Sequence, residues 1–314
     1  MWLQKFRKGS WLVVSLVALG VVLQSCMKNN DDDVYDAYKI LNEDIVTIKE
    51  YLASNGIDAV QDSFRTDGSG TGIFYQLHEE GEGYKALQGV ELEFQYQGQT
   101  LDGVEFVNNF GSNAITITLG NSDTYPTSVT AAVAIGFSLM QEGDSMTVYA
   151  PSPYGFQDQG YQDVPPNSIL VYTIKFLDIK KLSEEYEKID QYIVDNNMTA
   201  AIDPVYGARY VIHRVGNNIT PDRGAFISTH YQGELLDGTV FDTSYDSGSP
   251  LGFTYGNGEL IPGFELGISN LHENDSATIF VPSIYGYGDS ATGEIPANSV
   301  LVFGLDIIRI SNPI

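Results

Sequence analysis

The stretch Gln97-Gly98-Gln99-Thr100-Leu101-Asp102-Gly103 recurs 135 positions later as Gln232-Gly233-Glu234-Leu235-Leu236-Asp237-Gly238. Two further pieces, which begin at Pro151 and Pro165, return 131 positions later. Solenoid and propeller repeats have periods of about 20–50 residues, so a period this long indicates a duplicated domain instead. The sequence therefore predicts one folding unit that is present twice.

Each copy begins with a helical pattern and continues with strands. Apolar residues recur at helical spacing over 40–52 and over 182–193. Runs rich in β-branched and aromatic residues follow, at 72–77, 90–96, 208–213, 276–281 and 300–307. One further short helix is expected in each copy, around 263–271 in the second. We therefore expect α+β domains, in which an antiparallel sheet is crossed by one helix. The N-terminal helices either pack on their own domain or pair with a partner chain, which would make a homodimer.

The first residues are typical of an export signal. Three basic residues stand within the first eight, and the apolar run 11–23 that follows is short for a membrane span. Leu23-Gln24-Ser25-Cys26 resembles a bacterial lipobox, although Gln24 departs from the small or aliphatic residue usual there. This resemblance implies a signal peptide over 1–25 and a lipid anchor at Cys26 that binds the membrane. The alternative is an N-terminal anchor helix that is not cleaved.

An acidic segment and an acidic overall charge follow from the composition. Residues 26–34 contain three consecutive aspartates and are expected to form a solvated tether, or resemble the acidic export tags of Bacteroidetes-type surface lipoproteins. The 41 Asp and Glu outnumber the 16 Lys and Arg, for a net charge of −25, which disfavours nucleic acid as a partner. We expect an outer-membrane lipoprotein, either periplasmic or surface-exposed. Its single cysteine excludes a disulfide within the chain.

The second copy contains a series of short motifs in a fixed order. They are His230-Tyr231-x-Gly233, Leu236-Asp237-Gly238-x-x-Phe241-Asp242, Leu260-Ile261-Pro262-Gly263-Phe264 and Tyr285-Gly286-Tyr287-Gly288. This series resembles the FKBP-type peptidyl-prolyl cis-trans isomerases over 208–310. The resemblance implies two tandem FKBP-like domains, at 35–180 and 181–314. Each would be a twisted antiparallel sheet wrapped around a short helix.

The resemblance also implies roles for individual residues. Four match positions of the family's catalytic centre: Tyr231, Asp242, Phe264 and Tyr287. Six more match positions that bind substrate in the family's proline pocket: Phe241, Leu251, Leu260, Ile261, Ile295 and Phe303. Phe264 stands where many members have tryptophan, and Ser247 stands near the point where some have arginine. An alternative interpretation of Asp242 is a solvated turn residue. For the aromatic residues, the alternative is the core of a fold without activity.

Such residues suit a reaction in which no covalent bond breaks. Rotation about an X–Pro bond is slow because the amide must lose its resonance at the twisted transition state. The carbonyl then becomes less polar, so a dry aromatic pocket binds the twisted amide better than the planar one. The expected substrates are proline-containing unfolded or partly folded polypeptides, including exported proteins. No cofactor and no metal are expected.

The first copy lacks several of these residues. Val107 replaces the aspartate, Val133 stands at the position of Phe264, and Phe156 replaces Tyr287. We therefore expect isomerase activity in the second domain and a weakly active or inactive first domain.

The main alternative is an inactive FKBP-like lipoprotein that binds clients or acts as a chaperone.

The four histidines show no metal-ligand spacing, and His230 is interpreted as structural. The run 31–33 lacks the glycine and distal glutamate of a calcium loop.

Overall fold

The computed structural model describes residues 37–62 and 71–313. They form two seven-stranded antiparallel sheets of the same topology. The first sheet has the order β1-β2-β6-β7-β3-β4 with β5 on β3, and the second has the order β8-β9-β13-β14-β10-β11 with β12 on β10. The first sheet comprises β1 (Val60–Gln61), β2 (Phe74–Glu79), β3 (Glu91–Thr100), β4 (Glu105–Asn108), β5 (Ile115–Thr118), β6 (Ser145–Ala150) and β7 (Leu170–Ile179). The second comprises β8 (Ala201–Ile202), β9 (Arg209–Arg214), β10 (Phe226–Leu235), β11 (Val240–Thr243), β12 (Leu251–Thr254), β13 (Ser276–Val281) and β14 (Leu301–Ser311).

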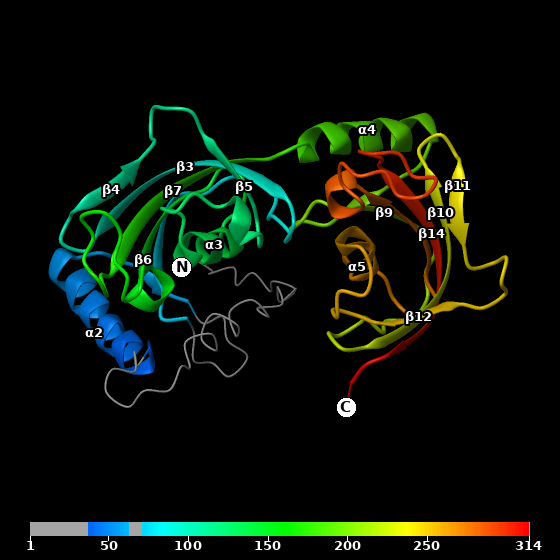
Figure 1. The fold of residues 1–314 in the computed structure, drawn as a ribbon. Coiled ribbons are helices and arrows are strands. Elements are labelled where there is room, and N and C mark those ends of the chain that lie inside the picture. Colours follow the sequence, from blue (N-terminus) through cyan, green and yellow to red (C-terminus); the bar gives the residue numbers. More distant parts are fainter. Residues whose placement is uncertain (1–36, 63–70, 314) are drawn as a thin grey trace, which may run out of the picture.

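Each sheet curves around one short helix, which lies on its concave face (Figure 1). These helices are α3 (Ala131–Leu139) and α5 (Pro262–Ile268). Each domain also has an N-terminal helix, α2 (Ala37–Asn55) or α4 (Leu182–Asp195). The expected α+β class and the expected pair of tandem domains, each a sheet wrapped around a short helix, are confirmed.

The two sheets have the same strand register, including one irregularity that occurs in both. β3 pairs with β7, and β10 pairs with β14. Both pairings shift register at the same point of the repeat, between Glu93 and Phe94 in the first sheet and between Ser228 and Thr229 in the second. A bulge of this kind bends a strand and increases its twist. The shared bulge helps to explain why both sheets curve in the same way.

Both N-terminal helices pack on their own domain through a buried carboxylate. In α2, Asp44 Oδ2 accepts hydrogen bonds from the backbone N–H (2.8 Å) and the hydroxyl (2.7 Å) of Ser152. In α4, Glu185 accepts the same two bonds from Ser283, at 2.6 and 2.5 Å. The serines open the 3₁₀ turns η2 (Ser152–Tyr154) and η3 (Ser283–Tyr285). The repeated Pro-Ser-x-Tyr-Gly motif therefore fastens each helix to its domain.

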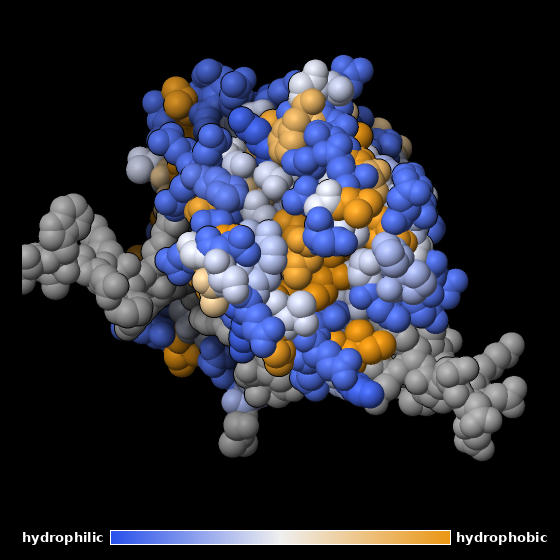
Figure 2. All heavy atoms as spheres, turned by 90° about the vertical axis from the view of Figure 1, so that its left-hand side faces the viewer, coloured by the Kyte–Doolittle hydropathy of each residue, from blue (hydrophilic) through white to orange (hydrophobic). Residues whose placement is uncertain are grey.

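The apolar faces of these helices complete the attachment. Ile48 and Leu52 of α2 pack with Phe74, Tyr149 and Val171 in a separate small core. The buried face of α4 joins the main hydrophobic core. Figure 2 views the molecule from the side of α2 and β4, and shows apolar surface gathered in the middle of this face among mainly hydrophilic residues.

The two domains meet around α4. Tyr84 of the first domain packs edge-on against Tyr186 of α4, with ring centroids 5.6 Å apart. The Arg209 guanidinium lies 3.7 Å from the centre of the Tyr186 ring and forms two 2.9 Å bonds with Asp190. A guanidinium stacked on an aromatic ring gains cation–π attraction while its edge remains free for a carboxylate. The α4 helix therefore contacts both domains.

Several expectations fall on residues outside the described ranges. They are the signal peptide over 1–25, the lipid anchor at Cys26 and the tether over 26–34. Among residues 37–62 and 71–313, no helix is both long enough and apolar enough to cross a membrane.

Candidate active site: an aromatic cluster on the second sheet

Phe264 forms the floor of an aromatic cluster on the concave side of the second sheet. It lies on α5 and is 4% exposed. Its ring packs edge-on against Phe303 of β14, Phe253 of β12 and Tyr231 of β10, with centroid distances of 5.0, 6.2 and 6.3 Å. Phe241 of β11 packs edge-on against Phe303 at 5.7 Å. Edge-to-face contacts suit aromatic quadrupoles and fix the rings relative to one another.

A glycine near the C-terminal end of β10 makes room for these rings. Gly233 pairs with Phe303 on one side and with Asp242 on the other. A Cβ atom at Gly233 would lie 2.6 Å from the ring of Phe241 and 2.9 Å from that of Phe303. Any larger residue would therefore displace the rings, which explains why the glycine is part of the repeated motif.

Among the described residues, the one strong polar contact at the cluster is the hydrogen bond between Tyr231 and Asp242. The Tyr231 hydroxyl donates a 2.5 Å hydrogen bond to Asp242 Oδ2. Burial, followed by this bond and the charge of Asp242, raises the pKa of Tyr231 to about 12. The phenol is therefore a proton donor at neutral pH, and its oxygen stays uncharged beside the apolar rings.

Four aliphatic residues and one exposed tyrosine complete the set of predicted site residues. Leu251, Leu260 and Ile261 are partly buried and pack on the core, and Ile295 is 6% exposed. Tyr287 is 40% exposed, so its hydroxyl can reach solvent or a bound peptide. Tyr287 and Ile295 lie on one long loop between β13 and β14.

The structure places the predicted residues around a single cluster. Tyr231, Phe241, Phe264 and Phe303 form its ring contacts, and Asp242 bonds Tyr231. Of the other five, Leu251 lies on β12, Leu260 and Ile261 immediately precede α5, and Tyr287 and Ile295 lie on the loop before β14. Phe253 also belongs to this cluster but was missed as a site residue. Its position two residues after Leu251, on the alternating strand β12, was the available signal.

In the first domain the corresponding tyrosines turn inward. Tyr96 is 2% exposed, and its hydroxyl bonds the Ser128 hydroxyl at 2.5 Å. Tyr172 stands where the second domain has Phe303; it is fully buried and bonds the Ser128 carbonyl and the Thr130 hydroxyl, both at 3.1 Å. Val133 is also fully buried. The polar groups are thus satisfied inside the domain rather than presented to a ligand.

Two further aromatic side chains cover the first domain's cluster. Phe156 and Tyr161 stack on each other at 4.6 Å, and both pack edge-on against Phe106, at 5.2 and 6.1 Å. Thr292 takes the place of Tyr161 in the second domain, as their matching bridges to Val164 and Ile295 show. In the first domain, Phe156 and Tyr161 therefore fill the space beside Phe106. In the second domain a smaller side chain, that of Thr292, stands at the position of Tyr161.

The loops that carry these residues differ in their glycines. In the first domain Gln157, Gln162 and Asn167 adopt left-handed backbone conformations, with φ of 55°, 50° and 56°. The second domain has Gly288 and Gly293 at the first two positions and Asn298 at the third, also with positive φ. Glycine adopts this conformation without strain and asparagine tolerates it, whereas glutamine is disfavoured.

Comparison with known proteins agrees with this arrangement. A family model described as FKBP-type peptidyl-prolyl cis-trans isomerase matches residues 83–177 and 217–308, one segment in each domain. The chain belongs to the FKBP-type peptidyl-prolyl cis-trans isomerase family.

Similar proteins come from bacteria and eukaryotes. The isomerase FkpA of Aeromonas hydrophila is 32% identical over 135 residues, 43% of this chain and 50% of that protein. FK506-binding protein 2 of Debaryomyces hansenii is 41% identical over 88 residues, 28% of this chain and 65% of that protein. The solved structure of FkpA from Escherichia coli has 26% identity and a TM-score of 0.36, over 42% of this chain and 62% of that one.

The relatives that match over longer stretches are larger proteins. Human peptidyl-prolyl cis-trans isomerase FKBP9 is 22% identical over 221 residues, 70% of this chain and 34% of that protein. The chain thus spans about a third of the length of this relative.

Proposed function

We propose that the second domain is a peptidyl-prolyl cis-trans isomerase and that the first domain has little or no turnover of its own. The observation that carries this proposal is the contrast between two clusters on one fold. The second cluster keeps the Tyr231–Asp242 bond and leaves Tyr287 exposed. The first has Val107 in place of the aspartate and is covered by Phe156 and Tyr161.

The chemistry follows from the environment of the rings. A prolyl ring packs on Phe264 and Phe303, while the preceding amide lies near the Tyr231 hydroxyl and Tyr287. As the amide twists, its carbonyl loses polarity and gains affinity for the apolar surface. Each 1.4 kcal/mol of preference for the twisted form accelerates rotation about tenfold. No nucleophile, general base, metal or cofactor takes part in this step.

A protease-coupled assay with a prolyl peptide tests the assignment on the intact mature chain. Asp242→Val combined with Phe264→Ala is expected to abolish turnover, and Phe106→Ala with Val133→Ala in the first domain is expected to preserve it. Equal loss from the two pairs would contradict the assignment to the second domain.

A second candidate function is client binding without turnover, as a chaperone for unfolded or partly folded exported proteins. The observation that favours it is the covered cluster of the first domain, which keeps Phe106, Phe156 and Tyr161 near the surface. Suppression of aggregation that survives Asp242→Val with Phe264→Ala, in a protein without isomerase activity, would establish this alternative.

We also propose that the protein is an outer-membrane lipoprotein held by a lipid on Cys26, facing the periplasm or the cell surface. The support is the lipobox-like sequence before Cys26 and the acidic segment after it. Replacement Cys26→Ala should release the protein from the membrane fraction and remove the mass of the acyl chains. Unchanged fractionation would refute the lipid anchor.

A further inference from the structure

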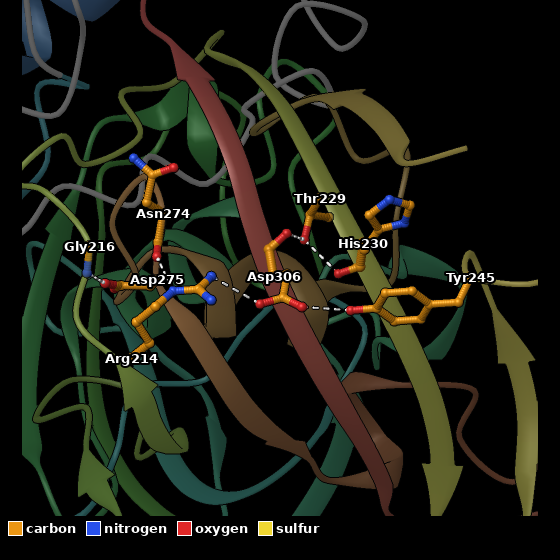
Figure 3. Close-up of polar contacts among 8 residues, drawn as sticks. All are labelled: Arg214, Gly216, Thr229, His230, Tyr245, Asn274, Asp275 and Asp306. Atoms are coloured by element: carbon orange, nitrogen blue, oxygen red, sulfur yellow. Dashed lines mark hydrogen bonds and ion pairs between the residues drawn. The ribbon is translucent and has the colours of Figure 1, made fainter. Parts of the chain in front are cut away.

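A polar network crosses the outer face of the second sheet, behind the aromatic cluster (Figure 3). Arg214 of β9 donates to Asp306 Oδ1 of β14 at 3.1 Å, and the Tyr245 hydroxyl donates to Asp306 Oδ2 at 2.7 Å. The Tyr245 ring stacks on the His230 ring of β10, with centroids 4.8 Å apart and planes 18° apart. The network therefore joins the strands β9, β14 and β10 to the loop that follows β11.

This loop is tied to the residues of the candidate active site. His230 precedes Tyr231 on β10, so their side chains point to opposite faces of the sheet. Ser244, next to Tyr245, is bonded to both backbone groups of Tyr231, at 3.0 Å to its carbonyl and 2.9 Å from its N–H. Its hydroxyl also lies 3.0 Å from His230 Nδ1. Asp242 stands only two residues before Ser244, at the end of β11.

Asp242 itself is exposed, and a solvated carboxylate is free to rotate away from its partner. Holding it 2.5 Å from the Tyr231 hydroxyl requires a backbone that is fixed from elsewhere. The pairing of Asp242 with Gly233 supplies part of this restraint, and the bonds from Ser244 and Tyr245 add to it on the chain immediately after Asp242.

The first domain provides a natural comparison at the same positions of the repeat. Lys175 and Glu79 occupy the places of Asp306 and Arg214, so the ion pair is reversed, with 3.9 Å between its atoms. Phe110 stands where the second domain has Tyr245 and lacks the hydroxyl, and Gln95 replaces His230. The tyrosine–carboxylate contact and the aspartate after the phenylalanine shared by both copies thus occur in the same domain, and both are replaced in the other.

We propose that His230, Tyr245 and Asp306 are positioning residues that hold the segment 242–245 from the outer face of the sheet, so that Asp242 stays within hydrogen-bonding distance of Tyr231. They do not touch substrate. Loss of the Tyr245 hydroxyl lets the segment move and weakens the Tyr231–Asp242 bond, while the aromatic cluster remains intact. The expected effect on catalysis rests on the proposed isomerase function, whereas the expected effect on the Tyr231–Asp242 bond does not.

The test compares Tyr245→Phe and His230→Gln with Phe110→Ala, the matched position in the first domain, in the intact mature chain. The first readout is the titration of Tyr231, followed by NMR of ¹³C-labelled tyrosine and assigned with Tyr231→Phe. In both second-domain variants the pKa of Tyr231 is expected to move from about 12 toward its ordinary value, because the bond to Asp242 is weakened. In Phe110→Ala it is expected to stay unchanged. An unchanged Tyr231 titration in folded Tyr245→Phe and His230→Gln would overturn the proposal.

The second readout is kcat/KM for a prolyl peptide. Tyr245→Phe is expected to lower it about fivefold, the effect of one net hydrogen bond of about 1 kcal/mol. Added to Asp242→Val, it should cause no further loss, because valine has no acceptor and the same contact is already absent. Full additivity would mean that Tyr245 acts independently of Asp242 and would also overturn the proposal. If the parent protein shows no isomerase activity, the proposed function fails, and the Tyr231 titration alone decides the positioning role.

Discussion

Exchanging one residue between the two loops should change the stability of the domains in opposite directions. Gln162 in the first domain and Gly293 in the second occupy the same position, with φ of 50° and 58°. A left-handed conformation costs an L-residue about 1–2 kcal/mol, and glycine loses about 0.4–1 kcal/mol through its freer unfolded chain. The net gain expected for Gln162→Gly is therefore about 0.5–1 kcal/mol, and Gly293→Gln should lose a similar amount.

The exchange introduces no steric clash, because a Cβ atom at Gly293 would meet no heavy atom within 4 Å. The change in stability thus reports backbone strain rather than a clash. Urea unfolding of the intact chain, combined with hydrogen exchange on peptides from each domain, assigns the effect to the domain that carries the substitution. A loss of stability in Gln162→Gly, or no change in Gly293→Gln, would refute the reasoning.

Three further outcomes are expected. Asp242→Asn should lower the pKa of Tyr231 from about 12, because the charge that helps raise it is removed and the remaining acceptor is a neutral amide oxygen; spectrophotometric titration against Tyr231→Phe measures this. Glu185→Ala should destabilise the second domain by about 2–4 kcal/mol, because the N–H and hydroxyl of Ser283 lose charged partners in a buried place; urea unfolding gives the value, and a loss below 1 kcal/mol would contradict it. Burial raises the pKa of Asp44 above its ordinary value, so its ionisation opposes folding: this contribution is absent at low pH and grows as the pH rises through the unfolded and then the folded pKa. Asp44→Asn should remove that part of the pH dependence, and identical profiles for parent and variant between pH 3 and 7 would exclude it.

The repeat and the hydrophobic periodicity were sufficient to predict the class of fold. The helices expected over 40–52 and 182–193 appear as α2 and α4, and the strand expected over 276–281 appears as β13 with the same bounds. The two helices have a clear helical period and β13 is rich in β-branched and aromatic residues, so local pattern and final packing agree. β3 and β14 extend further than their patterns, because pairing with long neighbours continues them past the apolar run.

Contacts between distant parts of the chain were harder to predict. Asp44 and Glu185 stand on the apolar faces of their helices, which was the signal that each has a buried partner, but the pattern does not name a serine about one hundred residues away. The covering of Phe106 by Phe156 and Tyr161 depends on how a loop folds back, which no local pattern specifies. The resemblance predicted a less active first domain because several site residues are missing. The structure adds that Phe156 and Tyr161 fill the space beside Phe106.

The contact of Tyr84 with Tyr186 and the nearby Arg209 has a consequence for how the gene can change. Deleting the first domain would leave the Tyr186 ring and the Arg209 guanidinium more open to water, and the Val205 carbonyl would lose the 2.9 Å hydrogen bond that it accepts from the Lys85 N–H. A first domain without turnover of its own would still cover this surface of the second, so a deletion that leaves the second domain alone is expected to lower its solubility.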